Sequence, residues 1–440
     1  MNRLKISVVA LLSATMLTAC SMPEFISDAI PGMGKSNSSS APTSAESTEP
    51  PKPKFDTGKF KTTPSPLKGD TNAETVRTVE SFVLAEYMPL PYEVDPILID
   101  TKGGYNVYGP GSLSMHLASN QIKLLEQFPP LYGFLNAASS QTEKVNEPRF
   151  AVNHAVLRFE DPETATKVAE AQHEVLTTVG PQLIEGADVT PEEKEFVEGM
   201  PNSLISSSHQ EYDDTFAVNA FTPHEEYVIY TWASAPAAEG TWSKDYVKKA
   251  LEHQIPLLEQ FPSVKTGAGY GKTDEYPSID PGGVLIYTIP QPDDAEYKKV
   301  PGSYGPRGLS SQFTDPKRMH EILEQNGSKH IGKRESFVFR ADTDFGAKAI
   351  LNAFIDSNLR GGEVEYEEPQ NVPDATCTMA EQPSGIQYNC YVLNGRYVGY
   401  VTGSSDTKKE SAEEAKKTVS QKTAAQYMIL EEADQEAGKK

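Results

Sequence analysis

Between residues 71 and 432, apolar positions follow two different periods in alternating blocks. Apolar residues that recur every three or four positions predict helices over 71–87, 117–128, 165–176 and 246–261. Blocks of alternating or continuous apolar residues predict strands over 151–159, 216–221 and 227–232. This first series of elements mixes helices with strands that are short enough to be joined by turns.

A similar series follows a connection at 263–283 that is rich in Gly, Pro, Ser and Asp. The same criteria predict strands over 284–289 and 335–340 and helices over 315–323, 347–355 and 411–430. Helix starts are indicated by Asp161-Pro162, by Asp315-Pro316 and, for a short helix, by Thr190-Pro191. Ser411 and Glu414 have the spacing of a capping box.

Short sequence matches suggest that the two series are copies of one unit. Tyr108-Gly109-Pro110 matches Tyr304-Gly305-Pro306, and Val156-Leu157-Arg158 resembles Val338-Phe339-Arg340. Tyr230 and Tyr400 occupy similar places before the closing helices. We therefore expect an α+β protein of two tandem domains, each an antiparallel sheet with helices packed mainly on one face. The predicted domains are an N-terminal one at 71–265 and a C-terminal one at 280–432.

The segment before the first domain has the features of a lipoprotein signal. Arg3 and Lys5 precede an apolar run from Ile6 to Leu17, which is too short to span a bilayer as a helix. Leu17-Thr18-Ala19-Cys20 then predicts cleavage of residues 1–19 and lipid attachment at Cys20. Residues 20–70, rich in Ser, Pro, Thr and Lys, are predicted to be a disordered tether. We expect the protein on the outer face of the plasma membrane, anchored through that lipid.

Charge narrows the class of partner. The chain carries 40 Lys and Arg against 62 Asp and Glu, a formal net charge of −22. Nucleic-acid binding depends on neutralising phosphates with basic side chains, so we expect no nucleic-acid partner. The fragment Asp342-x-Asp344-x-Gly346 lacks the other ligands of a calcium loop, and a surface turn is the simpler interpretation.

Two cysteines remain once Cys20 is assigned to lipid. Cys377 and Cys390 are almost symmetric about the predicted turn at Pro383-Ser384-Gly385, so they would face each other on two antiparallel strands. Asn394-Gly395 predicts a further hairpin directly after them. A structural disulfide is favoured over a redox-active or metal-binding pair, because neither closer spacing nor additional Cys and His ligands are present.

No motif in the chain specifies a reaction. The eight histidines form no His-Glu-x-x-His, and there is no Gly-x-Ser-x-Gly, phosphate loop or dinucleotide fingerprint. Tyr304-Gly305-Pro306-Arg307-Gly308 is a weak candidate for a recognition surface, although a turn that enters a helix would look the same. His154, Trp232 and Trp242 are interpreted as core or rim residues. We therefore expect no catalytic residue, cofactor or metal.

The ordered set of these features resembles a family. It comprises the signal, the tether, Val94-Asp95-Pro96, Ala155 to Phe159, Gln254 to Leu258, Tyr304 to Gly308 and the Cys377/Cys390 hairpin. Together they are similar to the two-domain lipoproteins of actinobacterial cell envelopes that are classed as domains of unknown function. This resemblance implies an extracytoplasmic location and no particular activity.

The leading functional hypothesis is a non-enzymatic envelope protein that binds or scaffolds a protein, glycan or lipid. One alternative is the substrate-binding lipoprotein of a transporter, whose lobes normally exchange several chain crossings around a cleft. Another is an envelope hydrolase whose site forms only in three dimensions.

Overall fold

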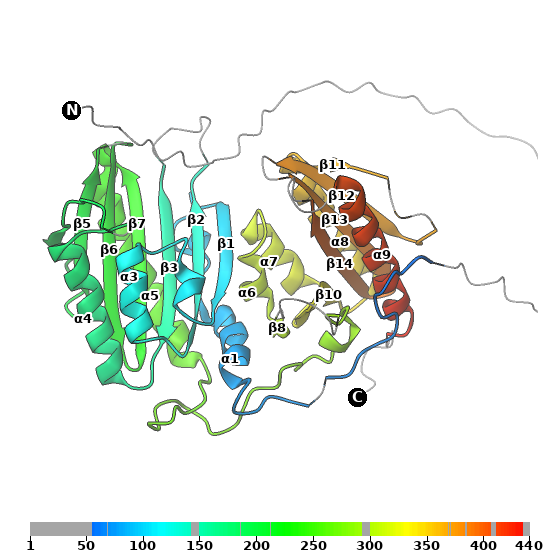
Figure 1. The fold of residues 1–440 in the computed structure, drawn as a ribbon, viewed down its shortest axis with the longest axis horizontal. Helices are drawn as coiled ribbons and strands as arrows, with labels where there is room; N and C mark the ends of the chain where they lie inside the picture. Colours follow the sequence, from blue (N-terminus) through cyan, green and yellow to red (C-terminus); the bar gives the residue numbers. More distant parts are fainter. Residues whose placement is uncertain are drawn as a thin grey trace, which may run out of the picture.

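The structure is a computed structural model that describes residues 55–67, 69–141, 149–184, 186–211, 213–292, 300–367, 369, 371–382, 385–405 and 411–433. The predicted signal peptide, Cys20 and the tether up to residue 54 lie outside the described residues. The described chain forms two halves, each built around one antiparallel sheet of seven strands (Figure 1).

The N-terminal half runs from α1 to α5. Its sheet has the order β1-β2-β3-β7-β6-β5-β4. The strands are β1 (Asp100–Val107), β2 (Tyr132–Ser139), β3 (Ala151–Arg158), β4 (Glu193–Glu195), β5 (Leu204–Gln210), β6 (Thr215–His224) and β7 (Tyr227–Pro236). The helices are α1 (Val76–Leu84), η1 (Ala85–Tyr87), α2 (Pro91–Val94), η2 (Pro110–Leu113), α3 (Ser119–Gln127), α4 (Pro162–Thr178), η3 (Ala237–Glu239) and α5 (Gly240–Gln260).

The C-terminal half runs from η4 to α9. Its sheet has the order β8-β9-β10-β14-β13-β12-β11. The strands are β8 (Gly302–Tyr304), β9 (Ile331–Lys333), β10 (Ser336–Arg340), β11 (Val364–Glu365), β12 (Ala375–Gln382), β13 (Gly385–Asn394) and β14 (Tyr397–Ser404). The helices are η4 (Leu285–Tyr287), α6 (Pro306–Ser310), α7 (Pro316–Gln325), α8 (Asp344–Arg360) and α9 (Ala412–Glu431).

The two halves have the same topology. The first sheet counted from β1 and the second sheet counted from β8 have the same order of strands. The helices α3, α4 and α5 occur at the same places in the chain order as α7, α8 and α9. The sequence matches fall on equivalent elements: Val156 to Arg158 ends β3, and Val338 to Arg340 ends β10. This is the arrangement expected of a duplicated unit.

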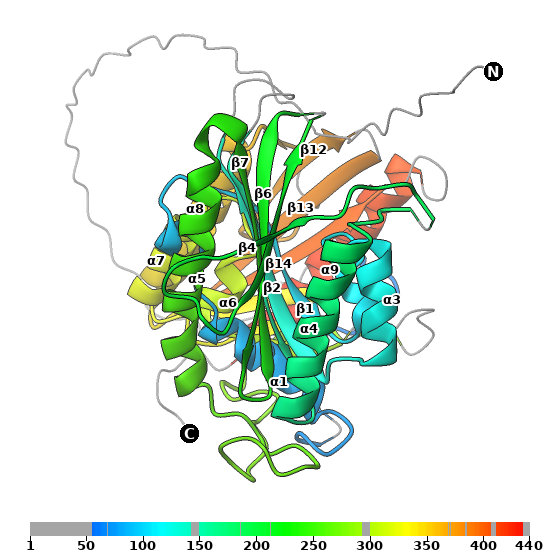
Figure 2. The same ribbon diagram turned by 90° about the vertical axis from the view of Figure 1, so that its left-hand side faces the viewer.

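The α+β class and the two antiparallel sheets are confirmed, but helices cover both faces of each sheet and not mainly one (Figure 2). Alternate residues of β7 show this directly. Ile229 packs in one cluster with Val247 of α5, whereas Val228 packs in another with Val168 of α4. The strand alternation places neighbouring side chains on opposite faces, and both sets are apolar and buried here.

Three predicted elements differ from the structure. The apolar run 284–289 contains the 3₁₀-helix η4 and no strand, because Oδ1 of Asp280 accepts hydrogen bonds from the Val284 and Leu285 N–H groups and caps a helical turn. Thr190-Pro191 leads into β4 and not into a helix. The first helix starts at Val76 and not at Thr71, since Asn72 holds the preceding turn through the Glu74 and Thr75 N–H groups.

The chain contacts the C-terminal half before it enters the N-terminal half. Residues 55–67, which we call the strap, run beside α9 (Figure 1). The Phe55 ring lies 5.6 Å from the Tyr427 ring of α9. At the other end of the strap, the Ser65 carbonyl accepts hydrogen bonds from the Arg334 guanidinium at 3.1 and 3.2 Å. The last part of the predicted tether therefore packs on the fold.

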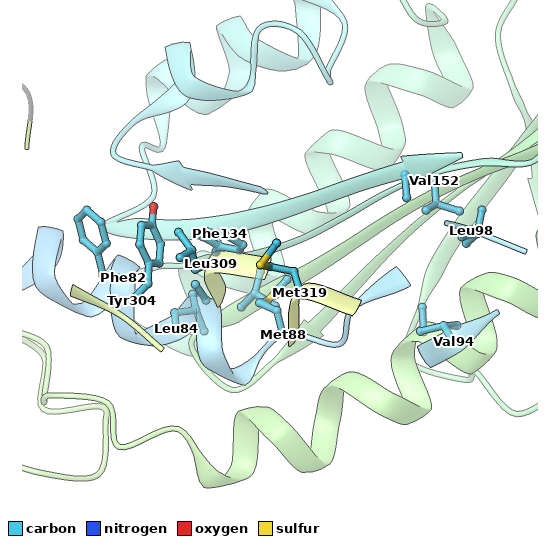
Figure 3. Packing of buried hydrophobic residues seen from close by; sticks show 14 of the residues in the cluster. Phe82, Leu84, Met88, Val94, Leu98, Phe134, Val152, Tyr304, Leu309 and Met319 are labelled. Atoms are coloured by element: carbon cyan, nitrogen blue, oxygen red, sulfur yellow. The ribbon is translucent and has the colours of Figure 1, made fainter. Parts of the chain in front are cut away.

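One hydrophobic cluster crosses the boundary between the halves (Figure 3). Phe82 of α1 packs against Tyr304 of β8 with ring centroids 4.6 Å apart. Leu309 of α6 is fully buried in the same cluster, where Gly308 approaches Ala85 so closely that a Cβ at position 308 would lie 2.6 Å from the Ala85 Cβ. The halves are therefore joined by a continuous core, and their relative placement is fixed by packing.

Candidate functional site

Polar groups add to the apolar contact between the halves. The Glu86 carboxylate accepts hydrogen bonds from the backbone N–H groups of Arg307 and Gly308, at 3.2 and 2.9 Å, across the boundary. The Arg307 guanidinium forms an ion pair with Glu93. Burial raises the pKa of Glu86, and the two N–H groups oppose that rise. The contact holds α6 against η1.

A groove of about 670 Å³ lies beside this boundary, along the edge strand β1. One wall is continuous from Thr101 to Asn106, and Tyr108 and Ser112 extend it. The opposite wall comes from the C-terminal half and consists of Tyr304, Gln312, Thr314 and Lys333. Cavities of this size accommodate small ligands, so the groove is the candidate site.

Two contacts tie the walls of the groove together. The Thr101 hydroxyl donates a hydrogen bond to the Ser311 carbonyl oxygen at 3.0 Å. Five residues along β1, Asn106 accepts a hydrogen bond from the Tyr304 hydroxyl. At a rise of about 3.3 Å per residue, these contacts are roughly 16 Å apart. The walls are thus held at a fixed separation over the length of the groove.

Three tyrosines give the groove its aromatic surface. Tyr105 and Tyr108 are 41% and 43% exposed, whereas Tyr304 is buried. The Tyr105 hydroxyl donates to the Lys102 carbonyl oxygen at 2.5 Å, and its ring packs 5.0 Å from the His116 ring. These contacts fix the orientation of an exposed aromatic face. Burial raises the pKa of the Tyr108 and Tyr304 phenols, which remain neutral at physiological pH.

The charged groups of the groove are lysines. Lys102 forms an ion pair with Asp100 at 2.5 Å, at one end of β1. The Lys333 ammonium lies 5.4 Å from the centre of the Tyr304 ring and 5.3 Å from that of Phe337. Among the described residues that line the groove there is no Asp, Glu, His or Cys.

The motif flagged in the sequence is divided between the groove and the boundary. Tyr304 lines the groove, but Arg307 faces Glu93, and Gly308 permits the close approach to Ala85. Sequence reasoning missed the β1 wall, because neither Tyr105 nor Tyr108 stands in a recognisable motif. The one available signal was the match between Tyr108-Gly109-Pro110 and Tyr304-Gly305-Pro306.

Other residues singled out in the sequence have structural surroundings. His154 is buried, with Nδ1 2.9 Å from the Thr231 hydroxyl and Nε2 3.0 Å from Gln254 Oε1. The Trp242 indole donates to Asp95 at 2.8 Å. The segment from Asp342 to Gly346 contains the start of α8, and the Thr343 hydroxyl there accepts a hydrogen bond from the Gly346 N–H. Among the described residues, no group of three or more His, Cys, Asp or Glu side chains could hold a metal ion.

A buried charge cluster surrounds Arg158 in the N-terminal half. Arg158, whose side chain is 1% exposed, forms ion pairs with Glu80 at 3.3 Å and Glu226 at 3.0 Å. Glu80 also accepts the Val264 N–H at 2.7 Å, and Arg158 donates to the Tyr270 carbonyl at 2.9 Å. These bonds attach the loop after α5 to the sheet, which is a structural role.

Cys377 and Cys390 lie opposite each other on β12 and β13 and are joined by a disulfide, with Cα atoms 4.2 Å apart. Both are buried beneath α9 and far from the groove in the fold. In the N-terminal half, Ile205 and Ala220 pair at the equivalent register of β5 and β6. The disulfide thus replaces an apolar pair of the other half.

Polar networks also repeat between the halves. The Tyr230 hydroxyl donates to Asn219 Oδ1, and Asn219 Nδ2 donates to the Glu192 carboxylate at 3.0 and 3.1 Å. In the C-terminal half, Tyr400, Asn389 and Glu363 form the same chain of hydrogen bonds. The sequence had matched only the two tyrosines. The first network is buried and the second partly buried, and they hold β4 and β11 to their sheets.

Within the described part of the chain, no helix is both long enough and apolar enough to cross a membrane. A second hollow, of about 330 Å³, lies beside α4 and is lined in part by Thr166 and Glu170. It is smaller than the groove, and its lining residues all belong to the N-terminal half.

Comparison with known proteins gives a family and a likeness among solved structures. Among solved structures, the extracellular domain of PknH from Mycobacterium tuberculosis matches with 11% sequence identity and a TM-score of 0.29, covering 44% of this chain and 100% of that chain. No curated protein matches significantly. The N-terminal model of the domain of unknown function DUF7373 matches residues 67–269, and its C-terminal model matches 285–433. The chain therefore belongs to the DUF7373 family and contains both parts of its domain.

Proposed function

We propose that this protein is a lipid-anchored, extracytoplasmic binding protein of the cell envelope, and that its ligand occupies the groove between the halves. The single observation that carries the proposal is the groove itself. The groove is formed by both halves, and hydrogen bonds join its two walls. Hydroxyl, amide, aromatic and ammonium groups from the two walls face the same space. Such a convergence of polar groups in a concave site is typical of ligand binding.

The location part of the proposal is supported by residues in two places. Leu17-Thr18-Ala19-Cys20 has the pattern of a lipoprotein signal, and the lipid on Cys20 would provide the membrane contact. A disulfide between Cys377 and Cys390 is the kind of bond that persists in an oxidising compartment. The acidic net charge disfavours nucleic acid as a partner.

Binding without catalysis is favoured by the lining. General acid–base chemistry at neutral pH normally uses His, Asp, Glu or Cys, and the described residues that line the groove include none of these. This observation disfavours the envelope hydrolase. A substrate-binding lipoprotein of a transporter would share a groove between two lobes, but here each sheet is completed by one continuous part of the chain.

The proposal is tested by screening defined saccharides, peptides and phospholipid head groups against the purified protein. A ligand of the groove should raise the melting temperature and slow amide exchange in β1. Thr314→Trp should abolish both effects, because the indole would fill the space between the walls. Thr166→Trp, in the hollow beside α4, is the matched control and should leave them intact. The proposal fails if no compound of the three classes binds, or if binding survives Thr314→Trp.

A further inference from the structure

A third hollow, of about 410 Å³, lies in the C-terminal half at the place where the strap begins. It is lined by the first turn of α8, by the hairpin that joins β13 to β14 and by Tyr427 of α9, and we call it the α8 hollow. We propose that Pro50 to Lys54, the part of the tether directly before the strap, docks in the α8 hollow. Docking here does not depend on any ligand of the groove.

Two aromatic side chains line the α8 hollow. Phe345, in the first turn of α8, is 82% exposed, and Tyr427 is half-buried. Covering such a ring with another segment removes apolar surface from water and is favourable. The corresponding hollow beside α4, next to the hairpin that joins β6 to β7, has no aromatic side chain among the described residues that line it. The two rings are therefore an addition to the duplicated fold and not a requirement of it.

The strap leads the tether to this hollow. The Phe55 ring lies 5.6 Å from the Tyr427 ring, at the start of the strap (Figure 1). The same ring packs in a cluster with Val372 and Ala375. These two residues come shortly before and directly after Asp374, which lines the hollow. The five residues before Phe55 span about 15 Å at roughly 3.1 Å per residue, so all of them are within reach of the hollow.

The prolines of the segment suit an aromatic surface. Pro50-Pro51-Lys52-Pro53-Lys54 contains three prolines in five residues. Such sequences favour the extended polyproline II conformation before they bind, so docking costs little conformational entropy. Proline-rich segments in this conformation are recognised by grooves that aromatic side chains line. The α8 hollow provides two such side chains beside the point where the segment ends.

The charges of the segment and the hollow are complementary. Lys52 and Lys54 are two of the three basic residues between positions 20 and 54. The hollow presents the carboxylates of Asp344 and Asp374, and neither forms an ion pair within the described part of the chain. Lys348 is the single cation among the described residues that line the hollow. The two carboxylates outnumber it, so the hollow attracts a basic segment.

The C-terminal tail, residues 434–440, is the competing occupant because α9 ends close to Tyr427. The tail contains no proline and no aromatic residue, and two of its first three residues are acidic. Its start would meet carboxylates that are already near Tyr427. Burial raises the pKa of Tyr427, and the charges of Glu431 and Asp374 add to this rise. Like charges therefore disfavour the tail, whereas they attract Lys52 and Lys54.

The test measures trypsin cleavage after Lys54 in the chain with its whole tether, and cleavage after Lys35 is the internal reference. Docking should protect the bond after Lys54 and leave the bond after Lys35 open. Phe345→Ala should speed cleavage after Lys54 by about tenfold, because the ring that the prolines cover is removed. Phe196→Ala, at a 77% exposed position of the N-terminal half, is the matched control and should change nothing.

A double-mutant cycle tests the charges. Lys52→Glu should speed cleavage after Lys54 by about tenfold, because both carboxylates of the hollow then repel the segment. In the Asp374→Asn chain the same change should have only about a threefold effect, since Asp344 alone remains. Asparagine keeps the backbone of position 374, whose φ of 51° is left-handed. Glu225→Gln, in the corresponding hollow of the N-terminal half, should leave the tenfold effect intact.

Hydrogen exchange identifies the occupant. Replacing Pro50 to Pro53 by Gly and Ser should speed amide exchange at residues 344–348, and deleting residues 434–440 should leave it unchanged. The reverse result would assign the hollow to the tail and overturn the proposal. Cleavage after Lys54 that Phe345→Ala does not change, or a Lys52→Glu effect that Asp374→Asn does not reduce, overturns it as well.

Discussion

The Tyr230 hydroxyl donates a hydrogen bond to Asn219 Oδ1, 3.0 Å away, and the two residues are 11 positions apart in neighbouring strands. Tyr400 makes the same bond to Asn389, with the same distance and the same spacing. Asn219 also donates a hydrogen bond to the Glu192 carboxylate next to β4, and Asn389 donates one to the Glu363 carboxylate next to β11. Each Tyr–Asn pair therefore links the centre of its sheet to the short strand at the edge.

Removing the hydroxyl of Tyr230 or of Tyr400 should destabilise the half of the protein that contains it. Tyr230→Phe and Tyr400→Phe leave the asparagine oxygen without its donor in a buried place, and each should lower the free energy of unfolding by about 1–2 kcal/mol. Urea denaturation measures the change. Tyr276→Phe, at a 47% exposed position, is the control and should have little effect. If only one of the two variants lowered the free energy of unfolding, the two networks would not be equivalent.

The disulfide should contribute measurably to the C-terminal half. Cys377 and Cys390 close a loop with a sequence separation of 13 residues, for which the chain-entropy model gives a stabilisation of about 3 kcal/mol. The double variant Cys377→Ile, Cys390→Ala introduces the pair found in the N-terminal half. This variant should keep the apolar packing between β12 and β13 but lacks the cross-link. It should therefore unfold at a lower urea concentration than the oxidised protein. An unchanged midpoint would show that the bond stabilises nothing.

His154 should make the protein sensitive to acid. Burial lowers the pKa of His154 from 6.5 to about 4, so the folded state resists a proton that the unfolded chain accepts below pH 6.5. Stability from this residue is therefore lost as the pH falls from 6.5 toward 4, by about 3 kcal/mol in total. His154→Gln should flatten this part of the stability–pH curve.

Glu86 has the opposite pH dependence. Its pKa is raised above 4.5 in the folded state, so the folded state binds the extra proton, and stability from this group falls as the pH rises through the folded pKa. Glu86→Gln should remove that decline, since an amide oxygen can still accept the N–H groups of Arg307 and Gly308.

Glu86→Ala removes the acceptor itself. It should lower the free energy of unfolding by about 1–3 kcal/mol and increase protease cleavage at the boundary between the halves. Glu174→Ala, on the exposed surface of α4, serves as the control. Equal stability of the Glu86→Ala and Glu86→Gln variants would contradict a role for the acceptor.

Lipid attachment is a prediction for a residue outside the described part of the chain. Cys20→Ala should abolish metabolic labelling with palmitate, because the acyl groups of a lipoprotein are carried by this cysteine. Labelling of the Cys377→Ile, Cys390→Ala variant should be normal. Persistent label on Cys20→Ala would contradict the anchor.

The sequence predicted helix starts and hairpins best where a side chain forms hydrogen bonds with residues only a few positions away. Asp161 caps α4 through the Thr164 N–H, and Ser411 and Glu414 form the capping box of α9. The hairpin predicted at Asn394-Gly395 joins β13 to β14, but its two turn residues are Gly395 and Arg396, because Asn394 still pairs with Tyr397. The prediction failed at 284–289, where an apolar run suited to a strand was turned into η4 by the single side chain of Asp280.

The groove could not be predicted because its two walls are about 200 positions apart in the chain. Asn106 and Tyr304 meet only after two complete sheets have packed through α1, α6 and η1. Neither residue has a partner of complementary chemistry nearby in sequence. Helices were expected mainly on one face of each sheet, whereas residues such as Val228 and Ile229 are buried beneath helices on opposite faces.

The strap determines how the molecule would carry mechanical load. Phe55 contacts Tyr427 on the last helix, and Ser65 is bonded to Arg334 of the same half. A pull transmitted from a membrane through the start of the chain would first strain these contacts on the C-terminal half. Only after Phe55 to Ser65 had detached would tension reach α1, so the groove wall formed by β1 would be shielded until then.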